Sequence, residues 1–382
     1  MVDVSIVPCP DYTPEGCRSA LTQVLTPLGG LDFVRPGMHI VIKANLVSAM
    51  KPEAAATTHP VLLCALTEFL TARGAQVVVG DSPGGLYTPA FVEHVYKLSG
   101  VHAVEEAGGR LNRDFSQKQA SLPQAKVAKT IQYTAYLDWA DVIIDFSKLK
   151  SHGMMGMSNA AKNMFGVIPG TLKPEYHYRF PDPRDFARMI VDLDEYFAPV
   201  LSITDAVVGM EGNGPTNGTP RPIGALAASR SPHKLDLLCA DLLGLRREEV
   251  PTLEAALERG LIPESVRELT VAGDPGAFRL ADFQTLETHN SHLFRDTSHG
   301  ALGRLISDFI QKAMCSRPQV EKSACIGCGH CRDICPAKAI VMENKLPRID
   351  RKECIHCFCC QEFCPKGAME VRRAAIARLL NR

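Results

Sequence analysis

The sequence lacks several features that would place the protein at once. It has no net charge, because 42 Lys and Arg residues balance 42 Asp and Glu residues, so no basic excess favours nucleic acid or an anionic membrane as the main partner. It has no run of about 18 apolar residues, which a membrane-spanning helix needs. Its first residues lack the basic and apolar regions of a signal peptide. We therefore expect a cytoplasmic protein with no nucleic-acid partner and no transmembrane segment.

Two common nucleotide-binding motifs are absent as well. No G-x-x-x-x-G-K-S/T sequence occurs, and the glycine-rich stretch Gly209–Gly218 does not fit G-x-G-x-x-G. We therefore predict neither a P-loop nor a Rossmann dinucleotide site. If the protein reduces a substrate, it does so directly or through another bound cofactor.

The chain does contain ample material for a large core. Its 382 residues, 46% of them hydrophobic, allow two or three domains at about 100–200 residues each. Apolar runs alternate with helix-like stretches through residues 1–273, which predicts an α/β domain with a mostly parallel sheet covered by helices. The expected strands are Val2–Val7, His39–Ala44, Gln76–Gly80, Asp141–Phe146, Val200–Asp205 and Gly224–Ala228. The expected helices are Pro14–Leu25, Pro60–Ala72, Arg184–Tyr196, Pro232–Leu243 and Thr252–Arg259.

Cysteine is abundant and unevenly distributed. Of 14 cysteines, four are scattered over the first 300 residues, and the rest lie between Cys315 and Cys364. In a long cytoplasmic chain such a concentration indicates metal binding rather than disulfides. The concentrated cysteines form two copies of C-x2-C-x2-C-x3-C-P, the first at Cys325–Pro336 and the second at Cys354–Pro365.

This repeated spacing is the run that binds [4Fe–4S] clusters in bacterial ferredoxins, where the fourth cysteine of each run binds the other cluster. We expect two [4Fe–4S] clusters. Cluster I is predicted to be held by Cys325, Cys328, Cys331 and Cys364. Cluster II is predicted to be held by Cys354, Cys357, Cys360 and Cys335. Zinc also binds C-x2-C pairs, but two complete four-cysteine runs disfavour it, and Cys315 and Cys359 fall outside the ligand spacing.

Residues 320–371 therefore resemble a two-cluster bacterial ferredoxin, which implies a small α+β domain. Each half is too short to bury a core alone, so the two copies are expected to pack face to face. Residues 274–319 are predicted to form a connector that ends in a packing helix at His299–Met314, whose apolar residues recur at helical spacing. Residues 372–382 are predicted to form a C-terminal helix.

Polar residues gather at the predicted strand ends of the large domain. Lys43 and Asn45 end one strand, Asp81 follows another, and the segment Lys148–Gly170 follows the strand that we expect to end at Phe146. Ligands in open α/β sheets bind outside the carboxyl ends of the strands, so these segments predict one site. The predicted catalytic residues are Lys150, His152 and Lys162. The predicted substrate-binding residues are Lys43, Asn45, His59, Asp81, Lys148, Asn163 and Glu211.

Crowded Lys and His side chains repel one another unless an anion lies between them. We therefore expect an anionic small molecule as the ligand. Each of these polar groups taken singly is also typical of an ordinary exposed strand end, and the glycine pairs are typical of turns. The hypothesis rests on their number and common placement.

The same segments, in the same order, resemble the uncharacterised family catalogued as domain of unknown function 362, over about residues 35–245. The matching pieces are K-x-N at Lys43–Asn45, TTHP at Thr57–Pro60, GDSPGG at Gly80–Gly85, KLKSH…AAKNMFGVIPG at Lys148–Gly170, GMEGNGP at Gly209–Pro215 and G-x-L at Gly224–Leu226. Members are often fused to a two-cluster ferredoxin module. The resemblance implies an iron–sulfur protein and supplies no reaction.

Three functions fit the whole chain. The first is an oxidoreductase that takes electrons from a soluble partner protein and passes them to the anionic ligand, with fusion replacing a bimolecular encounter. The second is a non-enzymatic electron-transfer subunit that docks a partner redox enzyme, which a large exposed apolar patch would favour. The third is a structural role for the clusters alone.

Overall fold

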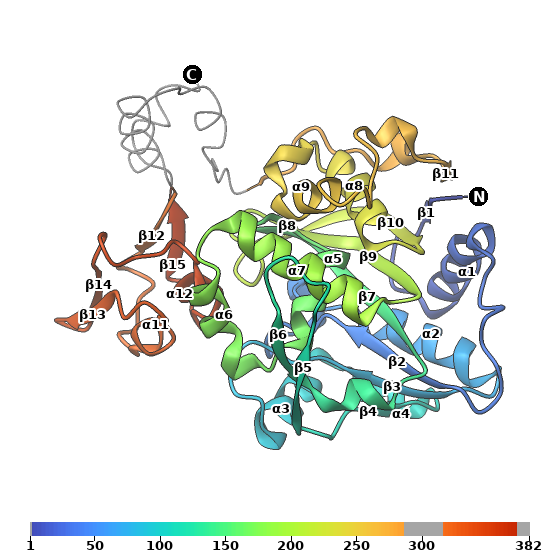
Figure 1. Ribbon diagram of the computed structural model, residues 1–382, viewed down its shortest axis with the longest axis horizontal. Helices are drawn as coiled ribbons and strands as arrows, with labels where there is room; N and C mark the ends of the chain where they lie inside the picture. Colours follow the sequence, from blue (N-terminus) through green and yellow to red (C-terminus); the bar gives the residue numbers. More distant parts are fainter. Residues whose placement is uncertain (1, 286–315, 373–382) are drawn as a thin grey trace.

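The computed structural model describes residues 2–285 and 316–372. The predicted helix His299–Met314, Cys315 and residues 373–382 of the predicted C-terminal helix lie outside the described residues. Arg372, the first residue of that predicted helix, is instead the last residue of the strand β15, Met369–Arg372. The described chain forms a large α/β domain, with a small module at one side of it (Figure 1).

One mixed sheet forms the centre of the large domain. The strand order is β11-β1-β10-β9-β7-β2-β3-β4, with β8 paired to β7. Strands β4, β3, β2, β7 and β9 are parallel, while β10 runs antiparallel between β9 and β1. The bounds are β1 Val4–Pro8, β2 His39–Ala44, β3 Gln76–Gly80, β4 Arg110–Leu111, β7 Val142–His152, β8 Gly156–Ser158, β9 Leu201–Glu211, β10 Thr219–Ser229 and β11 Val271–Ala272.

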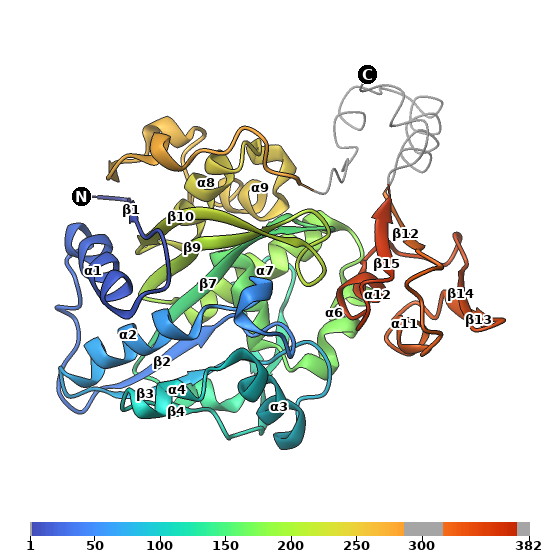
Figure 2. The same cartoon turned by 180° about the vertical axis from the view of Figure 1, so that it is seen from behind.

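Helices cover both faces of this sheet, as expected. On one face, Ile40 and Ile42 of β2 share a core with α1 and α2; on the other, Val41 packs with α7. Successive strand residues point to opposite faces, so a fully apolar strand such as β2 serves both cores. Figure 2 shows the face that α1, α2 and α3 cover. The helix bounds are α1 Pro14–Leu25, α2 Pro60–Thr71, α3 Pro89–Ser99, α4 Ala103–Glu106, α5 Ala160–Asn163, α6 Lys173–Arg179, α7 Pro183–Phe197, α8 Pro232–Leu242 and α9 Pro251–Leu257.

Three strands are longer than the sequence predicts. The strand predicted at Gly224–Ala228 is β10, which runs from Thr219 to Ser229. β7 continues past Phe146 to His152, and β9 continues past Asp205 to Glu211. The expectation that Lys148, Lys150 and His152 lie in a segment after the strand is therefore wrong. They are strand residues at every second position. A separate hairpin, β5 Gln117–Ser121 with β6 Thr130–Thr134, lies off the main sheet.

The small module is built from two similar halves, each with a short helix near its cysteine run. Its elements are β12 Arg317–Val320, α11 His330–Asp333, β13 Ile340–Glu343, β14 Leu346–Ile349, α12 Cys359–Glu362 and β15 Met369–Arg372. β12 pairs with β15, so residues 317–319 belong to this module and not to the predicted connector. Ile340 and Met369, from opposite halves, share one core with Cys335 and Cys360.

Helix α12 joins the small module to the large domain. The Thr216 hydroxyl donates to the Glu362 carbonyl (2.8 Å), and Asn217 Nδ2 donates to the Gln361 carbonyl (3.0 Å). Gln361 Nε2 in turn donates to the Asn213 carbonyl (2.9 Å). Phe358, just before α12, packs into a core of the large domain. The second half of the small module therefore contacts the loop that follows β9.

Candidate functional site

A buried ion pair lies where β2 and β3 end. Lys43 Nζ is 2.6 Å from Asp81 Oδ1, and both side chains are buried. The backbone N–H of Leu46 donates to Asp81 Oδ2 (2.6 Å), and that of Ser82 donates to Oδ1 (2.8 Å). A Cβ at Gly166 would lie 2.3 Å from Asp81 Oδ1, so only glycine allows the segment after α5 to pass over the pair.

Asparagine side chains extend this network across the sheet. Asn163 Oδ1 accepts from Asn45 Nδ2 (2.9 Å) and lies 3.4 Å from Lys43 Nζ. Lys150 Nζ donates to Asn45 Oδ1 (2.9 Å) and to the Ala56 carbonyl (2.7 Å). The structure thus brings five of the predicted residues into one continuous network: Lys43, Asn45, Asp81, Lys150 and Asn163.

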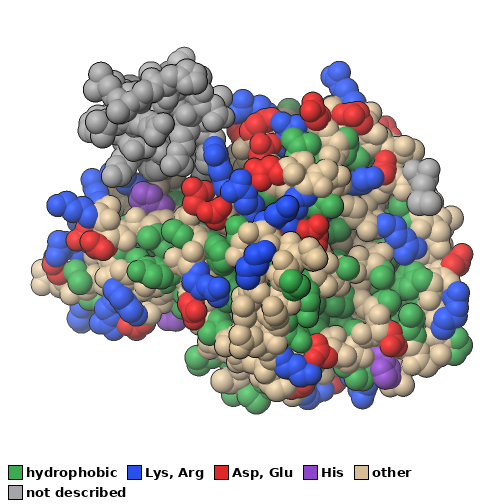
Figure 3. Space-filling model, viewed as in Figure 1, with side chains coloured by type: hydrophobic (Ala, Val, Ile, Leu, Met, Phe, Trp, Pro, Cys, Tyr) green, Lys and Arg blue, Asp and Glu red, His purple; other side chains and the backbone are tan. Residues whose placement is uncertain are grey.

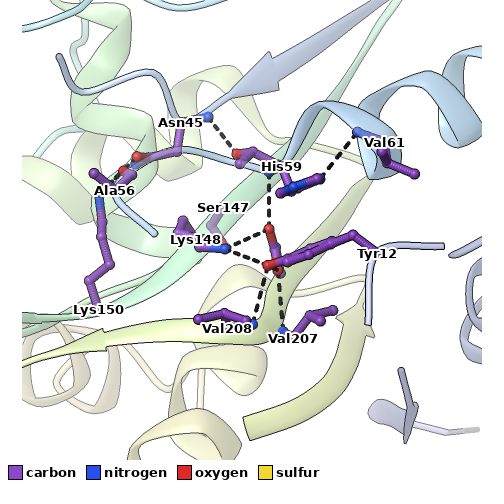
Figure 4. A network of polar contacts seen from close by, with 12 residues as sticks. Tyr12, Asn45, Ala56, His59, Val61, Ser147, Lys148, Lys150, Val207 and Val208 are labelled. Carbon is purple, nitrogen blue, oxygen red and sulfur yellow. Dashed lines mark hydrogen bonds and ion pairs between the residues drawn. The ribbon is translucent and has the colours of Figure 1, made fainter. Parts of the chain in front are cut away.

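A second network surrounds Lys148 (Figure 4). Lys148 Nζ is 2.9 Å from Asp205 Oδ2, and the Tyr12 hydroxyl donates to Asp205 Oδ1 (2.9 Å) and accepts from Lys148 (2.8 Å). The Tyr12 ring stacks on the His59 ring, with centroids 3.5 Å apart. Burial lowers the pKa of His59 to about 4, so its imidazole is neutral at pH 7. His59 Nδ1 accepts from the Val61 N–H, which caps α2.

The predicted catalytic residues come from β7 and α5. His152, at the end of β7, accepts the N–H groups of Met154 (3.1 Å) and Met155 (3.3 Å) at Nδ1. Its Nε2 is buried without a hydrogen-bond partner among the described residues. Burial, with Lys162 nearby, lowers the pKa of His152 well below its usual value. His152 is therefore a neutral imidazole whose Nε2–H is free to donate.

Lys162 lies at the junction with the small module. It is 8% exposed, and none of the hydrogen bonds of the described chain involves its Nζ. Its ammonium group lies 5.5 Å from the centroid of the Phe165 ring, an attractive cation–π distance. Burial lowers the pKa of Lys162, and the nearby Glu362 carboxylate of α12 partly offsets this.

Two further residues of this region, both in α6, are absent from the residues that the sequence predicts. Lys173 Nζ donates to the Ser82 carbonyl and lies 5.7 Å from the centroid of the Phe165 ring. His177 is buried and stacks on Phe186 with ring centroids 4.3 Å apart, and its Nδ1 has no hydrogen-bond partner in the part of the chain that the structure describes. Burial lowers the pKa of Lys173 to about 8 and that of His177 to about 3. The one signal in the sequence is that KPEYHYR begins at Lys173, three residues after the motif that ends at Gly170.

Glu211 lies apart from these residues. Its Oε2 accepts from the Gln284 N–H (3.1 Å), and its Oε1 lies 3.8 Å from Arg221. No described contact joins it to the lysines. Tyr12 and Asp205, which the prediction also omitted, lie next to Lys148 and contact its ammonium group.

The predicted ligand cysteines fall into two spatial sets. One hollow of the small module is lined by all four predicted ligands of cluster I, with Val320 and Met369 beside them. The predicted ligands of cluster II are near enough to one another to influence each other's ionisation: Cys335, Cys354, Cys357 and Cys360. The cysteines present thus fit two four-thiolate sites. Cys328 is exposed, whereas Cys335, Cys357 and Cys360 are buried, so the first set faces solvent and the second faces inward.

Comparison with known proteins identifies the class of the chain. Residues 317–365 match the family described as a 4Fe-4S dicluster domain, so the small module is an iron–sulfur-cluster-binding domain. Residues 40–241 match the family described as Domain of unknown function (DUF362). That match covers more than half of the chain, which therefore belongs to the DUF362 family.

Two individual proteins are similar to the chain. The thylakoid-associated protein sll1697 of Synechocystis sp. is 33% identical over 274 residues, which is 70% of this chain and 82% of that protein. The lactate racemase apoprotein from Thermoanaerobacterium thermosaccharolyticum is 12% identical, with a TM-score of 0.40, over 64% of this chain and 57% of its own. Across residues 2–285 and 316–372, no helix has the length and hydrophobicity to cross a membrane.

Proposed function

We propose that the chain is a two-cluster iron–sulfur oxidoreductase that passes electrons from a soluble partner protein to an anionic small molecule at the strand ends. The observation that carries the proposal is the docking of α12 on the large domain. This helix contains Cys360, a predicted ligand of cluster II, and Glu362, which neighbours Lys162. Electron delivery and ligand binding thus share one junction.

The two cysteine sets support two [4Fe–4S] clusters. Within the part of the chain that the structure describes, no three His, Cys, Asp or Glu side chains lie close enough together to hold a single metal ion. Thiolates around a cubane are spaced more widely than those around one metal ion, and the hollow that Cys325, Cys328 and Cys364 line is where cluster I would be held. The clusters would supply single-electron transfer.

The difference in burial between the two cysteine sets indicates the direction of electron transfer. The set near solvent includes the exposed Cys328, and next to it Ile326 is 60% exposed. Three of the four cysteines of the inner set, Cys354, Cys357 and Cys360, belong to the half of the module that contacts the large domain. A partner protein would therefore exchange electrons at the outer end, and the ligand would accept them at the inner end.

The side chains at the strand ends support an anionic ligand. Lys43 and Lys148 are neutralised by their aspartates. Lys150 has only neutral acceptors, and Lys162 has no hydrogen-bond acceptor among the described residues. His152 offers a free Nε2–H in the same region. These groups would bind an oxyanion and hold a proton next to it.

The test is anaerobic purification followed by analysis of iron, sulfide and zinc. The account expects about eight irons and eight sulfides per chain, from two cubanes, and a module that accepts and returns electrons. Lys150→Ala and His152→Ala should then keep both clusters and their reduction by dithionite but lose ligand binding. Stoichiometric zinc without iron would reject the proposal. Intact clusters together with unimpaired ligand binding in both variants would leave only the electron-transfer-subunit function.

A further inference from the structure

The cations at the domain junction are not balanced by the described acidic groups. Of the lysines there, Lys43 pairs with Asp81. Three others have no carboxylate in an ion pair with them among the described residues: Lys150 and Lys162, which are buried, and Lys173, which is partly buried. Glu362 of α12 is the acidic neighbour common to these three. When all three lysines are protonated, three positive charges face one negative charge, which leaves an excess of two.

Burial makes this excess costly. Lys150 and Lys162 are among the least exposed lysines, and a buried ammonium group requires hydrogen bonds and a counter-charge. Lys150 has hydrogen bonds but no counter-charge, and Lys162 has neither among the described residues. Two buried imidazoles lie next to Lys162, those of His152 and His177, and each keeps a nitrogen that has no hydrogen-bond partner among residues 2–285 and 316–372. A bound anion would supply the missing counter-charge of the lysines and would accept hydrogen bonds from the imidazoles.

We propose that the cluster of side chains at this junction binds a dianionic oxyanion, either a small dicarboxylate or a tetrahedral dianion such as phosphate or sulfate, and takes up protons as it does so. The cluster comprises Lys150, His152, Lys162, Lys173 and His177, with Glu362 at its edge. The inference rests on the proposed function only for its location; the binding itself requires no electron transfer.

Proton uptake follows from the state of the lysines in the free protein. Burial lowers the pKa of Lys150 to about 7, with Lys162 adding to the shift, and lowers that of Lys173 to about 8. At pH 8 Lys150 is mostly neutral, and Lys173 is about half protonated. A dianion stabilises the charged forms and raises both pKa values, so the lysines bind protons as the ligand enters. Below about pH 6 they are already charged and no uptake is expected.

Other charged groups near these lysines do not reverse this sign. Asp81 raises the pKa of Lys173, and Lys43 lowers it, but these two residues form an ion pair whose charges cancel. Lys148 lowers the pKa of Lys150 and is itself paired with Asp205. His152 and His177 are neutral near pH 7 because burial lowers both pKa values. The titrating groups are therefore the lysines.

Isothermal titration calorimetry on the oxidised two-domain protein tests the proposal. Malonate, phosphate and sulfate are the dianionic probes, and acetate is the monoanionic one. Titrations at pH 8 in two buffers of different ionisation enthalpy report the protons taken up. We expect the best dianion to bind at least about tenfold more tightly than acetate, with net uptake on the order of one proton per ligand. Comparing malonate with phosphate distinguishes a dicarboxylate ligand from a tetrahedral dianion.

Lys162→Gln should weaken dianion binding at least about tenfold and reduce the proton uptake. The matched control is Lys97→Gln, at an exposed position in the last turn of α3, which should bind like the original protein. Absorbance of the clusters verifies that the variants are intact. Equal affinity for acetate, or no binding of any dianion, would overturn the proposal, and the lysines would then only balance the charge of cluster II. Dianion binding without turnover would instead count against the proposed function.

Discussion

Phe363 lies directly against Gly84, so that a Cβ placed on Gly84 would be 2.4 Å from Phe363 Cε1. Gly84 follows β3 in the large domain, and Phe363 follows α12 in the small module. The glycine therefore allows the aromatic ring to approach the strand ends. This contact places the inner cysteine set next to the lysines.

Gly84→Val should loosen the small module without unfolding the large domain, because the new side chain occupies the space of the Phe363 ring. Hydrogen exchange at α12 should become faster, while exchange in β2 and β3 should not change. The double variant Gly84→Val with Phe363→Ala should recover part of the protection, since it removes the clash. Unchanged exchange at α12 in the single variant would show that the contact does not hold the module.

The ion pair between Lys43 and Asp81 should be important for stability. Asp81→Asn leaves a buried ammonium group without its counter-charge, and breaking a buried pair in this way costs about 3–5 kcal/mol. Replacing both residues, as in Lys43→Met with Asp81→Asn, should cost much less because no unpaired charge remains. Urea unfolding of the three proteins measures these differences. Equal losses in the single and the double variant would contradict the role given to the pair.

The fold was largely predictable from the sequence where burial is apolar. β2 and β3 have the bounds predicted for them, because His39–Ala44 and Gln76–Gly80 are short apolar runs flanked by turn residues. β7 was predicted too short because Lys148 and Lys150 are buried within it. Their burial depends on Asp205 and Asn45, which lie far away in sequence, so no local pattern indicates it.

The candidate site was predictable only in part, for a similar reason. Lys43, Asn45 and Asp81 lie at strand ends, and the edge that parallel strands share was enough to group them. His177 belongs to the seven-residue helix α6, which is too short for helical periodicity to reveal it in the sequence. Neither the helix nor the role of His177 could therefore be inferred. Tyr12 follows β1, and its contact with Lys148 spans 136 residues.

The cysteine pairing gives an independent prediction. Cys335→Ser should impair cluster II and leave cluster I, because Cys335 lies with Cys354 and Cys360. Cys364→Ser should impair cluster I, because Cys364 lines the other hollow. Electron paramagnetic resonance and iron content of the two variants distinguish the clusters.

Cys359→Ser is the control for this pair, since Cys359 is buried outside the predicted ligand spacing. It should retain both clusters. If Cys335→Ser and Cys364→Ser lost the same cluster, the fourth cysteine of each run would not bind the cluster of the other run, and the predicted pairing would be refuted.

The solvent-facing end of the small module, where Cys325, Cys328, Cys331 and Cys364 lie, should favour an acidic electron partner. Lys366 lines the hollow of the first cysteine set, and Lys345 is exposed beside Gly327. Lys and Arg side chains also lie on the exposed edge of this module, away from the large domain (Figure 3). Lys366→Glu should lower the rate of reduction by an acidic ferredoxin several-fold at low salt and much less at high salt. Lys97→Glu, on the large domain, should leave the rate unchanged in stopped-flow measurements, and a salt-independent effect would argue against electrostatic docking.

The central claim is that the ligand binds next to cluster II and away from cluster I. The most direct measurement is a redox titration, followed by electron paramagnetic resonance, with and without the dianion that binds best. The account predicts that the dianion shifts the potential or spectrum of the cluster that Cys335→Ser removes, and leaves the other unchanged. A shift confined to the cluster that Cys364→Ser removes, or no shift at saturating dianion, would contradict it.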